Sequence, residues 1–247
     1  MNTILGIWAH PDDETFVAGG FLADAVRRGD RVVCMHMTSG EAGLLDGRPC
    51  PPQTLARVRH HELQDSLAYL GVDEQRFLGY PDGYLDHVPN DDVVARIYDA
   101  LIEVEPDMVL TFGSDGFTGH PDHRSLSASV TTALEIWNQP ETQLGRAIVS
   151  SEWKERFVPP LNEFDMFWPG YPMITTTPDV TLHLDENLLD AKVEALRAHT
   201  SQMKPLFDAY GDGFVWAMAS TEHFLLTRSV GLGAGAGERT AALDAWA

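Results

Sequence analysis

Two short clusters of histidines and carboxylates hold the residue types in this chain that could do chemistry. The first is AHPDDE at residues 9–14, and the second is GHPDH at residues 119–123. In each cluster two ligand-type side chains stand three positions apart, so both can project to one side of a turn that enters a helix. No cysteine stands nearby, and imidazole with carboxylate favours a metal site built from nitrogen and oxygen ligands.

Each cluster follows a predicted buried strand, at 3–8 and at 108–112. In an open α/β sheet the binding crevice lies beyond the carboxyl ends of the strands. If these two strands are neighbours, His10, Asp13 and His123 can supply three ligands and leave one position for water, as in a catalytic zinc site. A single His-Pro-Asp triplet is more often a turn with an aspartate cap, but two at equivalent strand-to-helix junctions favour the metal.

The elements that must position these residues alternate between short apolar runs and amphipathic stretches. This pattern predicts a Rossmann-like, three-layer α/β/α fold with a mostly parallel sheet and a smaller C-terminal β/α section that closes the pocket. No Gly-x-Gly-x-x-Gly fingerprint follows the first strand. We expect one domain over residues 1–230 and a small-residue tail over 231–247. Predicted strands are 3–8, 31–37, 76–78, 108–112, 180–184 and 222–227, and predicted helices are 14–28, 54–70, 91–104, 121–137 and 186–203.

The segment 138–180 is harder to interpret. It contains six of the 15 prolines of the chain, which predicts irregular loops. The histidines outside the two clusters show no ligand spacing. For His36 we expect no metal role, and for His199 helix packing. Glu14 either orients a ligand or favours the start of its helix through its charge.

The charge balance excludes several kinds of partner. There are 17 Lys and Arg against 37 Asp and Glu, a net charge of −20, so nucleic acid and anionic membranes are not expected partners. Two cysteines are too few for a disulfide framework, and no signal peptide or run of about 18 apolar residues is present, which favours a cytoplasmic location. The expected partner is a small-molecule substrate, and the apolar end of the tail is compatible with a homo-oligomer.

The paired motifs resemble those of the LmbE-like (PIG-L) family of zinc-dependent N-acetylglucosaminyl deacetylases. The resemblance covers residues 3 to about 204. Further blocks that look like those of the family are TSGEAG at 38–43, Arg59 with Glu62, Leu70-Gly71, GYPDG at 79–83, Lys192 and HTSQ at 199–202.

The resemblance implies a role for each residue of the two clusters. It implies three metal ligands: His10, Asp13 and His123. It further implies that Asp12 is the general base that activates zinc-bound water, that His120 stabilises the oxyanion and protonates the leaving amine as an imidazolium, and that Asp122 orients His120. Imidazole and carboxylate ligands accept Fe²⁺ as well as Zn²⁺.

Three further residues are candidates for substrate binding, each with a structural alternative. Arg59 either contacts substrate or forms a surface ion pair with Glu62 on a helix. Asp82 either binds sugar hydroxyls or makes the Pro-Asp-Gly turn. Thr118 stands where the mycothiol-pathway deacetylase of the family has a tyrosine, so a different acyl amide or sugar is expected.

The expected reaction is removal of the N-acetyl group from an N-acetylglucosamine-type amino sugar or a small glycoside conjugate. Two alternatives remain open from the sequence. One is an amidase that acts on a thiol conjugate or another acetamide at the same metal site. The other is a non-catalytic sugar- or nucleotide-binding Rossmann domain in which the histidine motifs only build turns.

Overall fold

A seven-stranded sheet runs through the computed structural model, which describes residues 1–170 and 173–228, and its strand order is β3-β2-β1-β4-β5-β7-β6. The strands from β3 to β5 in this order are parallel, while β7 and β6 continue the sheet in antiparallel pairing. The strands are β1 (Thr3–Trp8), β2 (Arg31–His36), β3 (Glu74–Phe77), β4 (Met108–Phe112), β5 (Gln143–Ala147), β6 (Val180–His183) and β7 (Thr221–Arg228).

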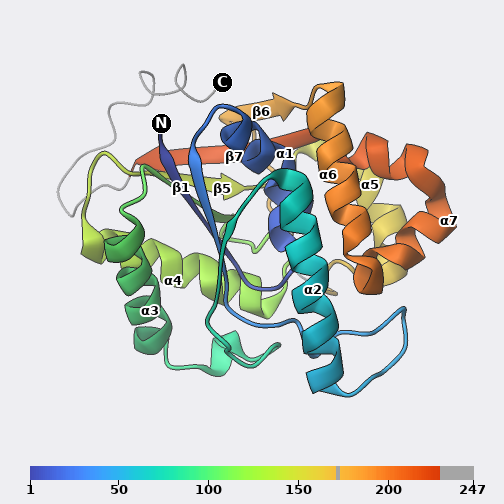
Figure 1. Ribbon diagram of the computed structural model, residues 1–247, viewed down its shortest axis with the longest axis horizontal. Helices are drawn as coiled ribbons and strands as arrows, with labels where there is room; N and C mark the ends of the chain where they lie inside the picture. The colour runs from blue at the N-terminus through green and yellow to red at the C-terminus, as the bar shows by residue number, and fades with distance from the viewer. Residues whose placement is uncertain (171–172, 229–247) are drawn as a thin grey trace.

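Helices cover both faces of this sheet (Figure 1). Helices α1, α2 and α6 pack together, and α3 packs on α4. The predicted three-layer α/β class with a mostly parallel sheet is therefore confirmed. The helices are α1 (Asp13–Arg27), α2 (Pro52–Leu70), α3 (Asn90–Val104), α4 (Pro121–Trp137), α5 (Ser151–Leu161), α6 (Glu186–Ala198) and α7 (Thr200–Ala219), with short 3₁₀ turns η1 (Leu85–His87) and η2 (Asn162–Phe164).

Strands β1 and β4 are parallel neighbours at the centre of the sheet, with Ile4 opposite Met108. All five residues of β4 and the last five of β1 are buried, as expected for strands covered on both faces. The chain leaves β1 to reach β2 on one side and leaves β4 to reach β5 on the other. The carboxyl ends of β1 and β4 thus form the switch point at which such sheets bind ligands.

The structure differs from the prediction in two regions. The segment 138–180, predicted as irregular loops, contains β5 and α5, and both prolines of α5 fall in its last three residues. Only pairing with β4 and β7 makes β5 a strand, and a window of sequence does not contain that pairing. The predicted helix 186–203 is divided at His199, whose ψ of 53° is not helical, and its second piece, α7, continues to Ala219 through residues for which no element was predicted. The predicted tail, 231–247, lies outside the described residues.

A buried ion pair joins the C-terminal strand to the first helix. Glu222 of β7 accepts hydrogen bonds from the backbone N–H groups of Gly20 and Phe21, at 2.7 and 2.8 Å. Lys192 of α6 donates to the same carboxylate at 2.7 Å, and its side chain is 2% exposed. Both charges are therefore compensated inside the protein, which is the condition for burying them.

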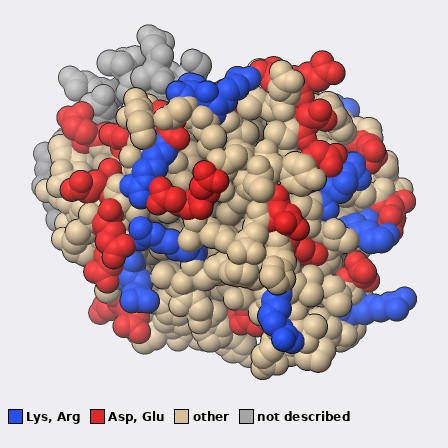
Figure 2. Space-filling view, viewed as in Figure 1, with Lys and Arg blue, Asp and Glu red and all other residues tan. Residues whose placement is uncertain are grey.

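The surface is acidic, as the composition requires. On the face drawn in Figure 2, Asp and Glu side chains are widely spread, and Lys and Arg side chains are interspersed among them. Among the described helices, none combines the length and the apolar character that crossing a membrane requires.

Candidate metal centre and catalytic site

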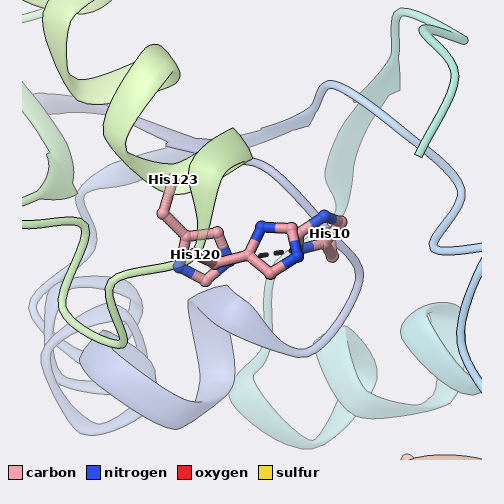
Figure 3. A group of neighbouring side chains, drawn as sticks. All are labelled: His10, His120 and His123. Carbon is pink, nitrogen blue, oxygen red and sulfur yellow. Dashed lines mark hydrogen bonds between the residues drawn. The ribbon is translucent and has the colours of Figure 1, made fainter. Parts of the chain in front are cut away.

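The two clusters meet at the carboxyl ends of β1 and β4. His10 follows β1, and the other two imidazoles belong to the start of α4, where His120 is the N-cap and His123 lies in the first turn (Figure 3). His10 Nδ1 and His123 Nε2 lie 3.1 Å apart, and Asp13 lies 3.3 Å from His123 Nε2 and 3.5 Å from His10 Nδ1. Tetrahedral bonds of ~2.0–2.2 Å place ligand atoms ~3.3–3.6 Å apart. The fold therefore brings the triad of predicted ligand residues together, with Asp13 Oδ1 toward His123 and Asp13 Oδ2 toward His10. The three imidazoles of His10, His120 and His123 also form a group whose ligand atoms lie within 4.8 Å of one another.

Hydrogen bonds to the outer ring nitrogens fix which nitrogens face the centre of this triad. His123 Nδ1 donates to the carbonyl of Gly116 at 3.0 Å, which leaves a lone pair on Nε2. His10 Nε2 contacts Asp82 at 2.9 Å and Asp122 at 3.3 Å, which leaves a lone pair on Nδ1. Two lone pairs that face each other repel, and a cation between them removes the repulsion. The donor set therefore fits a metal ion.

The charges of the triad suit the same role. Burial opposes ionisation of Asp13, but His123 and His10 outweigh it and lower its pKa to about 2. Burial lowers the pKa of His123 to about 4, so its imidazole is neutral at pH 7. Burial also acts against protonation of His10, but hydrogen bonds to Asp122, Asp13 and Asp82 raise its pKa well above the ordinary value. A proton on His10 thus takes the place of a cation in the metal-free protein.

Asp12 is held beside the triad in a strained conformation. Its φ of 106° places a non-glycine residue in the left-handed region, immediately before α1. Arg59 Nη2 donates to its carboxylate Oδ2 at 2.8 Å, and Glu14 Oε2 accepts from its backbone N–H at 3.1 Å. Burial raises the pKa of Asp12 to about 6, with Asp13 adding to the rise and Arg59 opposing it. At neutral pH Asp12 is therefore a carboxylate with more basicity than an exposed aspartate.

His120 differs from the expectation in its charge. Burial, with the positive charge of His10 next in size, lowers its pKa, so the ring is neutral at pH 7. Its Nδ1 accepts the backbone N–H of Asp122 at 3.2 Å, which leaves Nε2 as the N–H donor. In the metal-free protein the ring is thus a neutral hydrogen-bond donor, and the imidazolium expected in the working enzyme stays a prediction.

The carboxylate of Asp122 has other partners than the expected one. It accepts the backbone N–H groups of Gly83 and Leu85 at 2.8 and 3.0 Å and contacts His10 Nε2 at 3.3 Å. Only its backbone N–H contacts His120. The fully buried side chain points away from the helix end and toward the loop after β3, and there it orients His10, not His120.

Asp82 and Arg59 both line the cavity and make contacts that neither sequence alternative included, while residues 82 and 83 form the predicted turn. Asp82 binds His10 and the N–H of Ala42 at 2.8 Å, so it adds a second carboxylate behind the imidazole of His10. Arg59 is 5% exposed and binds Asp12 and the carbonyls of Gly40 and Pro11, and no ion pair with Glu62 forms. The Glu62 carboxylate instead accepts the N–H and the hydroxyl of Ser201, each at 2.7 Å.

Thr118 lies beside the triad, with its hydroxyl 3.3 Å from His123 Nδ1. Its carbonyl accepts the N–H of Trp168 at 2.8 Å, and the ring of Trp168 stands edge-on to His120 with centroids 5.2 Å apart. Trp168 is 48% exposed and was not singled out in the sequence, because it lies in the proline-rich segment interpreted as loops. It places an aromatic surface at the edge of the site.

Most of these residues border one cavity of about 360 Å³, while Asp122 and Trp168 lie outside its lining. Loops after the strands supply one side, while η2 and α7 supply the other, so the C-terminal part of the chain does contribute to the pocket. The residues that line the cavity include His10, Asp12, Asp13, Arg59, Asp82, Thr118, His120, His123, Phe164, Asp165, Met166, Gln202, Met203 and Leu206.

Comparison with known proteins places this site in a family. Residues 5–134, more than half of the chain, match the family model PIG-L: GlcNAc-PI de-N-acetylase. A 1D-myo-inositol 2-acetamido-2-deoxy-alpha-D-glucopyranoside deacetylase of Corynebacterium diphtheriae is 30% identical, covering 81% of this chain and 75% of its own. A probable N-acetyl-alpha-D-glucosaminyl L-malate deacetylase 2 of Bacillus cereus is 27% identical, covering 83% and 86%.

Solved structures agree on the fold. The N,N'-diacetylchitobiose deacetylase of Pyrococcus horikoshii superposes with a TM-score of 0.68 at 21% identity, covering 92% of this chain and 84% of its own. The match to the family model includes both histidine clusters, and these clusters are the residues that the fold brings together. The chain therefore belongs to the PIG-L (LmbE-like) family of de-N-acetylases.

Proposed function

We propose that this protein is a zinc-dependent hydrolase that removes the N-acetyl group from an N-acetylglucosamine-containing small glycoside. The proposal rests on membership of the deacetylase family together with one observation. His10 Nδ1 and His123 Nε2 stand 3.1 Å apart, and the two carboxylate oxygens of Asp13 lie 3.3 and 3.5 Å from them, in a cavity that Asp12 and His120 also line.

The residues that would hold the metal are His10 through Nδ1, Asp13 through its carboxylate and His123 through Nε2. When bound, zinc lowers the pKa of water to ~7 and polarises an amide carbonyl. Asp82 and Asp122 hold the imidazole of His10 from behind, and Gly116 holds His123, so the ligand set is oriented before the cation arrives.

The remaining side chains divide the proton transfers. Asp12 accepts a proton from the attacking water, since its carboxylate lines the cavity and burial has raised its pKa. Arg59 holds Asp12 Oδ2 and leaves Oδ1 as the oxygen without a partner among the described residues. His120, with Nε2 protonated, donates a hydrogen bond to the oxyanion of the amide, and the proton that Asp12 took from water passes to the leaving amine when the C–N bond breaks.

The cavity also indicates the class of substrate. Carboxylates of Asp12, Asp82 and Asp165 line it, and the one guanidinium among its described lining residues, Arg59, is already occupied by Asp12. An anionic aglycone would meet repulsion without a compensating cation. We therefore expect a neutral or cationic glycoside, in contrast to the L-malate conjugate named for the Bacillus cereus relative.

The test combines metal analysis with product analysis. Purified protein is dialysed, its zinc and iron are quantified, and acetate release is measured on neutral N-acetylglucosaminides such as N,N'-diacetylchitobiose, on N-acetylglucosaminyl malate and on simple acetamides. We expect one zinc per chain and acetate release from a neutral glycoside. Asp12→Asn should keep the metal and lose activity, while His123→Ala should lose both. Full activity of Asp12→Asn, or a dialysed protein without metal that still releases acetate, would overturn the proposal.

A further inference from the structure

A second group of buried histidines surrounds one carboxylate behind the site. Glu14, His36 and His199, which we call the Glu14 cluster, are each 0% exposed and none of them lines the cavity. His36 Nε2 contacts Glu14 Oε2 at 2.9 Å, and His199 Nε2 contacts Glu14 Oε1 at 3.4 Å. Two imidazoles from distant parts of the chain thus converge on one side chain of α1.

Burying these two histidines lowers the stability of the fold, so a role in packing alone does not explain them. Each imidazole uses one ring nitrogen on Glu14, and the other nitrogen, Nδ1, is buried without a partner among the described residues. An unpaired buried polar atom lowers stability, and an apolar side chain of similar shape would avoid that loss. The histidines are therefore placed to donate to Glu14 and not merely to fill the core.

The carboxylate that the two histidines hold in place also binds the backbone of Asp12. The oxygen that His36 holds, Oε2, is also the one that accepts the backbone N–H of Asp12 at 3.1 Å. That N–H belongs to the residue with a φ of 106°, a conformation that persists only where surrounding contacts impose it. Arg59 fixes the carboxylate of Asp12, and Glu14 fixes its backbone.

We propose that Glu14, held by His36 and His199, is a positioning residue that keeps the Asp12 peptide in its strained conformation and thereby aims the Asp12 carboxylate into the cavity. This inference rests on the proposed function of Asp12 as the base. His36 lies at the end of β2 and His199 lies just before α7. Two residues that are far apart in sequence therefore act on Asp12 through the carboxylate of Glu14.

The kinetic test is a double-mutant cycle on the zinc-loaded protein, with the most reactive glycoside of the panel as the probe. Glu14→Gln should lower kcat about 10- to 100-fold, leave KM within about twofold and keep one zinc per chain. In the Asp12→Asn background the same change should cost nothing further, because the residue through which it acts is already disabled. If the double variant loses kcat by the product of the two single losses, Glu14 has a separate structural role, and the proposal is overturned.

Two substitutions of His36 test the proposal a second time, one expected to lower kcat and the other to restore it. His36→Leu removes the donor to Oε2 and should lower kcat, whereas His36→Gln keeps an N–H donor near the Nε2 position and should recover most of it. Ser129→Ala is the matched control: Ser129 is equally buried, and its hydroxyl donates to Asn90 Oδ1 and to the carbonyl of Ser125, away from Glu14, so kcat should be unchanged.

A crystal structure of Glu14→Gln gives a readout that needs no substrate. The φ of Asp12 should leave the left-handed region, and the contact with Arg59 should lengthen. A variant that retains both, or one with wild-type kcat, would overturn the positioning role. Activity in Asp12→Asn alone would instead overturn the proposed function, so the two failures are distinguishable.

Discussion

His10 Nδ1 and His123 Nε2 lie 3.1 Å apart, and the other ring nitrogen of each histidine makes a hydrogen bond. In the metal-free protein the hydrogen bonds of His10 to Asp122, Asp13 and Asp82 outweigh burial and keep a proton on His10, whereas burial keeps His123 neutral. A proton and a metal therefore compete for the same gap.

Metal binding should consequently release protons. At pH 7 we expect about one proton per zinc, and a zinc affinity that falls as the pH is lowered. Titration calorimetry in buffers of different ionisation enthalpy measures this number directly. A binding enthalpy independent of the buffer would contradict the competition between proton and metal.

Asp12→Asn should stabilise the metal-free protein at neutral pH while abolishing activity. The pKa of Asp12 is raised from 3.8 to about 6, so the folded state binds this proton more tightly than the unfolded state, and stability falls as the pH rises from about 4 to about 6. Above pH 6 the loss is up to about 3 kcal/mol, which a neutral amide avoids. Asparagine also tolerates the left-handed φ.

Urea unfolding of chelator-treated proteins at pH 7.5 and at pH 4 tests this difference. The variant should be the more stable at pH 7.5 by about 1–3 kcal/mol, and the two proteins should converge at pH 4. A variant less stable than the wild type at pH 7.5 would show that the ion pair with Arg59 outweighs the cost of burying the charge.

Asp82→Asn should weaken zinc binding about 10- to 100-fold, because Asp82 orients the imidazole of His10 from a distance of 2.9 Å. Competition against a coloured chelator measures the affinity. Asp165→Asn is the matched control, since Asp165 is described in the structure, lines the same cavity and makes no hydrogen bond to His10. Equal affinities for both variants would rule out an orienting role for Asp82.

Trp168→Ala should act on substrate binding. The ring of Trp168 stands beside His120 and is 48% exposed, so a glycoside in the cavity can cover it. We expect KM to rise about 3- to 10-fold, with kcat and metal content nearly unchanged. Ile136→Ala removes another exposed apolar side chain, 58% exposed, from the far end of α4, and its KM should equal that of the wild type.

Lys192→Met should destabilise the fold by about 3–5 kcal/mol, because it leaves Glu222 buried without its counter-charge. Lys204→Met, which removes the exposed pair with Asp208, should change stability by less than about 1 kcal/mol. Denaturant unfolding compares the two variants. A small effect of Lys192→Met would mean that the N–H groups of Gly20 and Phe21 alone suffice for Glu222.

The triad was predictable because its signals are local. His10 and Asp13 follow one buried strand and His123 follows another, so strand order alone brings them together. The contact of Arg59 with Asp12 spans 47 positions, and that of His199 with Glu14 spans 185, and no periodicity reports such pairings. The contacts of His36 and His199 with Glu14 likewise depend on packing that only the fold contains.

The last described strand has a consequence for how the protein is made. β7 covers the edge of β5 and carries β6, yet it begins at Thr221, long after the residues of the catalytic site have been synthesised. Until β7 has been synthesised and has left the ribosome, β5 is an unpaired edge strand of the nascent chain. Unpaired edge strands are surfaces through which chains aggregate. Late closure by β7 therefore leaves the edge of β5 unpaired for the whole time that the chain between β5 and β7 is being synthesised.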